Sequence, residues 1–360
     1  MPNRKGAHKM KKTFLYIPTL YTGGAERQCV LIASELKGRG CDIEILVDNS
    51  ILVNAVNQAI VNESNIHVVT LPAGFLRKVF YLIRLFRKHK GAVVISFLTR
   101  PNFTAGLASI FVRHIHLYSE IRCGKLPARK LAIEWLTHKL LSTKTVFNSY
   151  RAFNTFTAHG FNRQKCLVIT NAFISTLIER RKHKGIVIVA VGRFIPEKDY
   201  YTWLRVVRKV LDEGVSIQAK IQGWGAEEDR IREWVSALGL DSAVSILPGA
   251  GDVSALLGGA DIYLSTSLSE GVSNSIMEAM NAKLPVVATD VGDNERLIET
   301  GCSGFLAKVG DVEELAKCVI RLAENHKMRE EFGERAFDLL AKRFSLRTIV
   351  DEYQSLLEKE

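Results

Sequence analysis

The amino-acid sequence predicts an α/β protein built from two doubly wound domains, each with a parallel sheet. Short apolar segments alternate with amphipathic segments of helical period along the chain, an order typical of parallel sheets. The alternation is interrupted by a polar, basic segment at 177–185 and then starts again. A length of 360 residues allows two domains of ordinary size, each with its own hydrophobic core.

The first half of the chain is expected to supply one sheet and the helices that cover it. Short, almost wholly apolar segments fit strands that are buried on both faces. The expected strands cover residues 13–18, 42–47, 92–98, 115–119 and 145–147, and the expected helices include residues 25–37, 75–89 and 129–141. These elements form a first domain over residues 1–176.

The second half repeats this pattern. The expected strands cover residues 186–191, 216–221, 244–247, 261–265 and 284–288, and the expected helical segments cover 201–213, 227–237, 274–280, 312–325 and 329–341. They form a second domain over 186–344, joined to the first by a linker at 177–185. A last helix within 345–360 carries an apolar face, so it must pack against a domain.

Composition and cysteine usage favour a cytoplasmic protein. Hydrophobic residues make up 47% and charged residues 24% of the chain, as in ordinary soluble domains. The first twelve residues are basic and no apolar signal segment follows them, and no apolar stretch is long enough to span a membrane. Six cysteines without C-x-x-C spacing argue against a zinc site or a disulfide framework.

Charge is distributed unevenly. The net charge of +11 combines +20 over residues 1–185 with −9 over 186–360. This asymmetry indicates an anionic partner for the first domain, either a membrane surface or a phosphorylated acceptor. Despite a pI of about 9.3, the chain lacks the interleaved aromatic and basic motifs of nucleic-acid readers.

A basic amphipathic stretch lies within that first domain. Its apolar residues include Phe75, Phe80 and Phe86, and its basic residues are Arg77, Lys78, Arg84, Arg87, Lys88 and Lys90. Such a helix can lie on the inner, anionic face of a membrane, which would make the protein peripheral. It can equally pack on its own sheet and expose a solvated face, and the sequence leaves both alternatives open.

The most informative segment is residues 267–298. Glu270 follows an apolar strand, and Glu278 lies about two turns into the helix behind it. The backbone N–H groups of residues 271–274 would open that helix, and a helix N-terminus attracts phosphate. A carboxylate nearby accepts hydrogen bonds from sugar hydroxyls, so this arrangement favours a nucleotide sugar. An isolated pair of glutamates with this spacing would more often be ordinary loop and helix residues.

Two further groups follow first strands of the domains. Gly23 and Gly24 come after the strand at 13–18, where glycine lets the backbone approach a ligand closely. Arg193 and Lys198 come after the strand at 186–191, where two cations suit a diphosphate. Alone, the first pair would be read as a tight turn and the second as a solvated loop.

These three segments together resemble glycosyltransferase family 4. The resemblance rests on SLSEGVSNSIMEAMNAKLPVVATDVGDNERLI at 267–298, GRFIPEKDY at 192–200 and TGGAERQ at 22–28. It implies the GT-B fold, in which two Rossmann-like domains with parallel sheets face a central cleft. It also implies that the last helix returns to the first domain.

The resemblance assigns roles to individual residues. Arg193 and Lys198 would stabilise the departing nucleoside diphosphate, Glu270 would hold the donor sugar near its reacting carbon, and Glu278 would bind the ribose. The remaining expected substrate contacts are Gly23, Gly24, Leu247, Gly249, Gly271, Val272, Ser273 and Asn274.

One position departs from the family. Many members carry a histidine after the fourth or fifth strand of the first domain, where this chain has Ser119, Glu120, Ile121 and Arg122. Some relatives have a similar variant, so Glu120 and Arg122 are candidate active-site residues. An internal ion pair at the domain edge is an equally good interpretation.

The function implied is retaining transfer of a sugar, a hexose, from a nucleotide sugar to an acceptor hydroxyl. A UDP-sugar is the favoured donor, and the acceptor expected is a lipid-linked glycan or a lipopolysaccharide or capsule precursor. The family usually needs no metal, no other cofactor is expected, and no D-x-D triplet is present. The alternatives are a nucleotide-sugar epimerase of the same fold and a non-catalytic carbohydrate- or nucleotide-binding protein.

Overall fold

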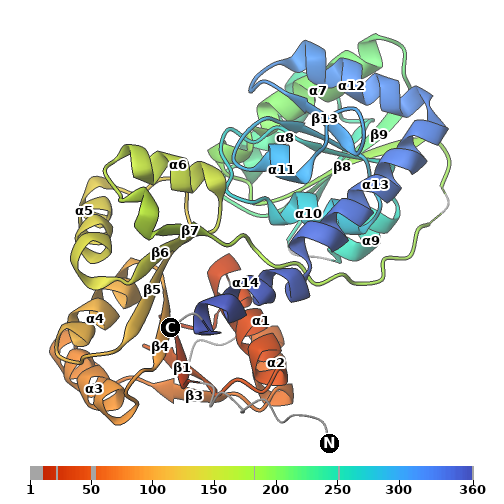
Figure 1. The fold of residues 1–360 in the computed structure, drawn as a ribbon. Helices are drawn as coiled ribbons and strands as arrows, with labels where there is room; N and C mark the ends of the chain where they lie inside the picture. Colours follow the sequence, from red (N-terminus) through yellow and green to blue (C-terminus); the bar gives the residue numbers. More distant parts are fainter. Residues whose placement is uncertain (1–10, 22, 50–53, 182, 250–251, 359–360) are drawn as a thin grey trace, which may run out of the picture. The chain divides into compact units, whose positions relative to one another are not determined.

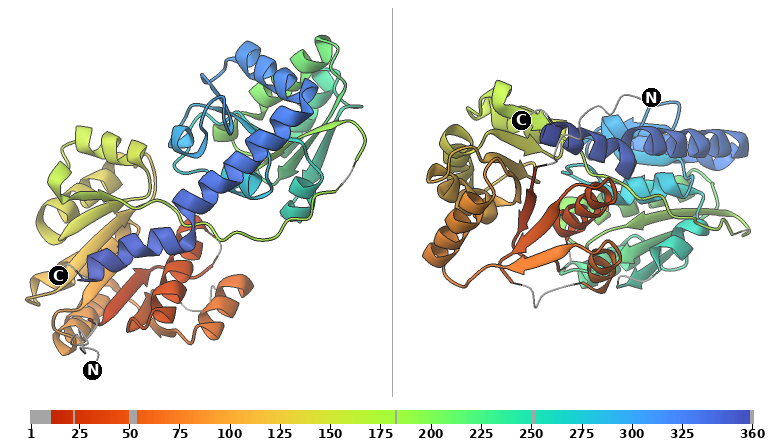
Figure 2. Two further views of the ribbon diagram at one scale, coloured as in Figure 1. Left: turned by 45° about the vertical axis from the view of Figure 1, so that its right-hand side comes forward. Right: turned by 60° about the horizontal axis from the view of Figure 1, so that its bottom comes forward.

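The computed structural model describes residues 11–358 except 22, 50–53, 182 and 250–251. The chain divides into two compact units, which are coloured in sequence order in Figures 1 and 2. The first unit contains residues 1–172 and 346–360, and the second contains residues 173–345. Among the described residues, no helix is both long and apolar enough to cross a bilayer.

The first unit is a seven-stranded parallel sheet in the order β3-β2-β1-β4-β5-β6-β7. Its strands are β1 (Thr13–Ile17), β2 (Ile43–Val47), β3 (His67–Thr70), β4 (Val93–Phe97), β5 (His116–Ile121), β6 (Lys144–Phe147) and β7 (Cys166–Val168). Its helices are α1 (Gly24–Gly38), α2 (Ala55–Glu63), α3 (Phe75–Lys88), α4 (Thr99–Ile110), α5 (Ala128–Leu136), η1 (Thr137–Leu141), α6 (Tyr150–Ala158), η2 (Arg163–Lys165) and α14 (Leu346–Glu358).

Both faces of this sheet are covered, which explains why its strands are apolar throughout. In β1, Leu15 and Ile17 join a core that includes residues of α1 and α14. Phe14 and Tyr16 point to the other face and pack with residues of α3 and α4. This alternation follows from the two-residue period of a strand.

The second unit is a six-stranded parallel sheet in the order β10-β9-β8-β11-β12-β13. Its strands are β8 (Ile186–Val191), β9 (Ile217–Gly223), β10 (Val244–Pro248), β11 (Ile262–Ser265), β12 (Val286–Thr289) and β13 (Gly304–Ala307). Its helices are η3 (Pro196–Lys198), α7 (Tyr200–Asp212), α8 (Glu228–Ala237), α9 (Val253–Gly258), α10 (Asn274–Asn281), α11 (Asn294–Leu297), α12 (Val312–Glu324) and α13 (His326–Phe344). The predicted α/β class with two Rossmann-like sheets is therefore confirmed.

The boundary between the units differs from the expected one at residue 176. Residues 173–185 belong to the second unit, so 177–185 is not a free linker. Ile178 packs against the core beneath α10, and the Arg181 N–H donates to the Gly258 carbonyl over 2.8 Å. A Cβ at Gly258 would lie 2.3 Å from the Glu179 carbonyl oxygen. These contacts are largely backbone contacts, which a basic, polar sequence does not reveal.

The last helix, α14, completes the first unit and packs against α1 (Figure 1). A buried polar network fixes it to the sheet. The Tyr353 hydroxyl donates to Glu120 Oε1 over 2.6 Å, and Arg122 Nη1 pairs with Glu120 Oε2 at 2.5 Å. Arg122 Nη2 donates to Asn171 Oδ1, also over 2.5 Å. The side chains of Arg122 and Glu120 are only 4% and 2% exposed, so each depends on the other for its charge compensation.

We predict that Arg122→Leu destabilises the protein much more than its loss of hydrogen bonds suggests. The substitution leaves the Glu120 carboxylate buried without its cation, which costs about 3–5 kcal/mol. Tyr353→Phe removes one hydrogen bond to a charged group and should cost about 1.5–3 kcal/mol. Urea unfolding followed by circular dichroism measures both, and a wild-type midpoint for Arg122→Leu would contradict the assignment.

Candidate functional site

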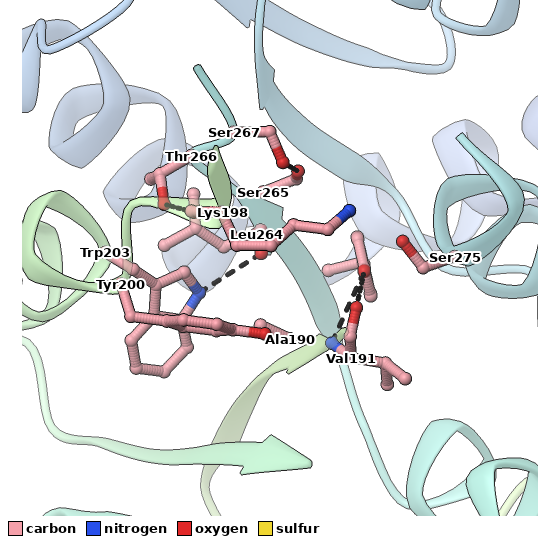
Figure 3. Close-up of a pocket in the computed structure, with 11 residues that line it drawn as sticks. Ala190, Val191, Lys198, Tyr200, Trp203, Leu264, Ser265, Thr266, Ser267 and Ser275 are labelled. Atoms are coloured by element: carbon pink, nitrogen blue, oxygen red, sulfur yellow. Dashed lines mark hydrogen bonds between the residues drawn. The ribbon is translucent and has the colours of Figure 1, made fainter. Parts of the chain in front are cut away.

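A pocket lies at the carboxyl edge of the second sheet, where open α/β sheets bind their ligands (Figure 3). Its walls come from β8, from the loop that leads into α7, from β11 and from the start of α10. The lining residues are Ala190, Val191, Lys198, Tyr200, Trp203, Tyr263, Leu264, Ser265, Thr266, Ser267 and Ser275. Because β8 and β11 are neighbours in the sheet, the loops that follow them meet here.

Lys198 and Glu270, which are 72 positions apart in the sequence, form an ion pair at this edge. Lys198 Nζ donates to Glu270 Oε1 over 2.5 Å, and the Ser267 hydroxyl donates to the same oxygen over 2.8 Å. The two side chains are 20% and 13% exposed. An ammonium group has three donors, so Lys198 keeps two for oxygen atoms of a ligand. Figure 3 shows its side chain extending from the loop over the pocket.

The loops that carry these two residues are joined by hydrogen bonds. The Thr266 hydroxyl donates to the Asp199 carbonyl over 2.9 Å, and the Leu268 N–H donates to the Glu197 carbonyl over 2.8 Å. Asp199 has a left-handed backbone (φ 47°), and its side chain accepts from the Thr202 N–H at the start of α7. This tight turn at Asp199 separates Lys198 from the first residue of the helix.

Glu278 is held by α10 and is largely buried, and burial raises the pKa of its carboxyl group to about 7. Its carboxylate has no hydrogen-bond or ion-pair partner among the described residues. No side chain caps α10: its N-cap residue is Ser273, and Gly271 and Val272 lead into it. The segment from Gly271 to Asn274 therefore forms the helix start that the sequence predicted, with a carboxylate available two turns along.

The sequence interpretation missed the loop after β12, which supports the Glu270 loop from behind. The Asp293 N–H donates to the Gly271 carbonyl over 3.0 Å, and the Thr289 hydroxyl donates to the Ser267 carbonyl over 2.6 Å. Gly292 has a positive φ of 61°, and a Cβ there would lie 2.4 Å from the Gly271 carbonyl oxygen. A Gly-Asp sequence three residues after an apolar strand was the available signal.

Arg193, Leu247 and Gly249 lie at the same edge but do not line the pocket. Arg193 is exposed and its guanidinium has no partner among the described residues, while its neighbour Phe194 anchors the loop in the core. Leu247 is half-exposed at the end of β10, and the Gly249 N–H donates to the Gly223 carbonyl over 2.7 Å. The structure thus brings Lys198 and Glu270 together and leaves Arg193 directed to solvent.

In the first unit, Gly23 and Gly24 open α1, as expected; Thr22 lies outside the described residues. The Glu26 side chain packs against Gly23. A Cβ added at position 23 would lie 2.1 Å from Glu26 Oε2, so this contact requires glycine or a movement of the Glu26 side chain. Arg27, which the sequence analysis did not single out, has a buried Nη1 without a hydrogen-bond partner among the described residues, and burial lowers its pKa. This cation is an additional candidate for contact with an anionic ligand.

Glu120 and Arg122 have the geometry of an internal ion pair. Both are buried, and their polar atoms face each other, Tyr353 and Asn171. This geometry favours the structural alternative over an active-site role, because neither side chain is presented to a ligand.

Comparisons with known proteins find similarity to glycosyltransferases. Residues 177–338 match the model of the family described as glycosyl transferases group 1. The lipopolysaccharide core biosynthesis glycosyltransferase LpsE of Rhizobium meliloti is 26% identical over 171 residues, 48% of this chain and 49% of that protein. An uncharacterized glycosyltransferase of Haemophilus influenzae is 24% identical over an alignment that covers 97% of this chain and 100% of that protein.

Solved structures show the same fold across both units. The crystal structure of Anabaena Alr3699/HepE in complex with UDP superposes with a TM-score of 0.84 at 20% identity, covering 98% of this chain and 100% of that one. Residues 177–338 are therefore similar to glycosyl transferases group 1, and the chain has the GT-B fold.

Proposed function

We propose that the protein is a retaining glycosyltransferase that moves a sugar from a nucleoside diphosphate sugar to an acceptor hydroxyl. The observation that carries this proposal is the Lys198–Glu270 pair beside the uncapped start of α10 and the unpartnered Glu278. A cation and a helix N-terminus suit a diphosphate, and two carboxylates suit the hydroxyls of ribose and sugar. Retention is supported by the family resemblance of these segments rather than by any distance.

Each group has a separate task in the proposed reaction. The start of α10 and Lys198 bind the diphosphate and stabilise the charge that develops as it departs. Glu278 accepts hydrogen bonds from the ribose, and Glu270, oriented by Lys198 and Ser267, holds the donor sugar. The acceptor oxygen bonds to the anomeric carbon as the bond to phosphate breaks, and the acceptor proton passes to the departing phosphate oxygen.

The donor and acceptor are proposed from similar proteins. The neighbour HepE is solved with UDP, which supports a UDP-sugar as the donor of this chain. LpsE is named for lipopolysaccharide core biosynthesis, which supports a lipid-linked glycan as the acceptor. An epimerase of this fold would release free sugar and a binding protein would release no product, so product analysis distinguishes the three functions.

We predict that Lys198→Ala and Glu270→Gln each lower kcat more than they raise KM for the donor. A charge-assisted hydrogen bond contributes about 1.5–3 kcal/mol, which corresponds to a loss of roughly 10- to 150-fold. Arg193→Ala tests the predicted phosphate contact of that exposed guanidinium in the same assay. Arg205→Ala, at an exposed position on α7, is the matched control. Full turnover by the Lys198 and Glu270 variants would remove the site assignment.

A second prediction concerns Glu278. Its folded pKa is raised to about 7 from an ordinary value of 4.5, so the folded state binds more protons than the unfolded state between these values. Stability should therefore fall as pH rises from 4.5 to 7, and Glu278→Gln should remove this component. The melting temperature of the variant should exceed that of wild type by an amount that grows up to pH 7, while its UDP affinity falls at least tenfold. Parallel pH profiles for the two proteins would contradict this.

We further propose that the first unit binds the surface of anionic membranes through α3. Leu76 and Phe80 are 68% and 64% exposed, and they share one face of the helix with the exposed Arg84 and Arg87. Exposed apolar side chains ringed by cations are typical of helices that lie in a lipid headgroup layer. Phe86 and Lys78 do not contribute, because Phe86 is buried and Lys78 is paired with Asp48 at 2.7 Å.

We predict flotation with anionic vesicles at low salt and its loss at high salt, because screening shortens the reach of surface charges. Replacing Arg77, Arg84, Arg87 and Lys88 with Gln should abolish flotation. The matched control replaces Lys308, Lys317, Lys327 and Lys342, exposed residues of the second unit, and should float like wild type. Equal flotation of both variants would show that α3 is not the contact.

A further inference from the structure

The first unit contains a second cavity that no residue of the proposed donor site lines. It measures about 180 Å³ and lies at the carboxyl edge of the sheet, between the starts of α3 and α4 and the middle of α5. Its lining residues are Asp48, Gly74, Phe75, Lys78, Thr99, Arg100, Phe103, Thr104 and Ile133. The cavity is smaller than the roughly 300–1,000 Å³ of drug-sized sites, so it suits one chemical group of a larger ligand.

One wall of this cavity is apolar. The rings of Phe75 and Phe103 are stacked, with centroids 6.2 Å apart and planes within 12°. Phe75 is 47% exposed, so the apolar wall reaches the surface of the unit. A ligand with an apolar portion can therefore pack against this pair of rings.

The cavity also has polar lining residues. Two of them, Asp48 and Lys78, carry opposite charges and form an ion pair. Asp48 accepts a hydrogen bond from the Tyr16 hydroxyl over 2.7 Å and pairs with Lys78 Nζ at 2.7 Å. The side chains of Lys78 and Asp48 are 11% and 12% exposed, so the two charges offset each other in a nearly closed environment. This pair shapes the cavity and contributes no net charge to it.

Arg100 adds the charge that is not compensated. Its side chain is exposed at the cavity, and its guanidinium has no hydrogen-bond or ion-pair partner among the described residues. The Thr104 hydroxyl donates to the Arg100 carbonyl over 2.8 Å, which fixes the backbone that carries this cation. A guanidinium beside a neutral cavity favours an anion, and its planar donors match two phosphate oxygens at once.

We propose that this cavity is a ligand site that binds a phosphate attached to an apolar chain. The phosphate lies against Arg100, and the chain packs against Phe75 and Phe103. This inference goes beyond the proposed glycosyl transfer, because the cavity belongs to the first unit and shares no lining residue with the donor pocket. A lipid phosphate and a soluble sugar phosphate share the anionic group, and the apolar wall commits the site to the lipid.

Titration calorimetry with n-octyl phosphate, below its micellar concentration, tests the proposal on the full-length protein. We expect octyl phosphate to bind at least tenfold more tightly than inorganic phosphate, 1-octanol or glucose 1-phosphate. Arg100→Gln and Phe75→Ala should each weaken octyl phosphate at least tenfold. Arg113→Gln, an exposed cation of the same unit outside the cavity, and the double variant Leu76→Ser/Phe80→Ser should leave it unchanged.

The outcomes separate this inference from the proposed function. Equal binding of glucose 1-phosphate and octyl phosphate, or wild-type affinity of Arg100→Gln, would overturn the lipid-phosphate assignment. A loss in the Leu76/Phe80 variant would also overturn it, because the probe would then be binding the surface of α3. UDP affinity, measured in parallel, should be unaffected by Arg100→Gln, and an absence of UDP binding in wild type would refute the transferase proposal alone.

Discussion

The ion pair between Lys198 and Glu270 is the contact on which the proposed donor site depends. It joins the loops after two neighbouring strands, and the hydrogen bonds from Thr266 to Asp199 and from Leu268 to Glu197 run beside it. Both groups of a partly buried pair lose contact with water, so the pair needs close geometry and further hydrogen bonds such as the one from Ser267 to Glu270. The site is therefore preorganised by the sheet, and a ligand does not have to order it.

Much of this arrangement could be predicted from the sequence, because the central strands are apolar throughout and adjacent strand ends meet at one edge. Lys198 and Glu270 were predicted for this reason. The short outer strands β3, β7 and β13 were not, since a segment such as His67–Thr70 is only partly buried and lacks an apolar signature. Lys78 was expected in the solvated basic face, but Asp48, which follows β2, pairs with it.

The remaining differences come from contacts that side-chain patterns do not encode. Position 292 requires glycine because its Cα packs so closely on the Gly271 carbonyl that a Cβ would clash with it. Residues 173–185 belong to the second unit partly because of main-chain hydrogen bonds. Glu120 lies near the end of β5 and Arg122 follows that strand, where site residues are often found, but the hydrogen bond from Tyr353 of the last helix makes the pair part of the packing of the first unit. Such a partner becomes visible only when elements distant in sequence are placed together.

The position of α14 has a consequence for how the protein is made. On the ribosome, all seven strands of the first sheet emerge before the second unit, but the helix that covers Glu120 and the core beside α1 emerges last. At translation rates of about 5–20 residues per second, the first sheet waits roughly 10–35 s for it. During that interval the part of its apolar face that α14 covers is exposed and Arg122 lacks one of its neighbours, so the nascent chain should need a chaperone most while its second half is being synthesised.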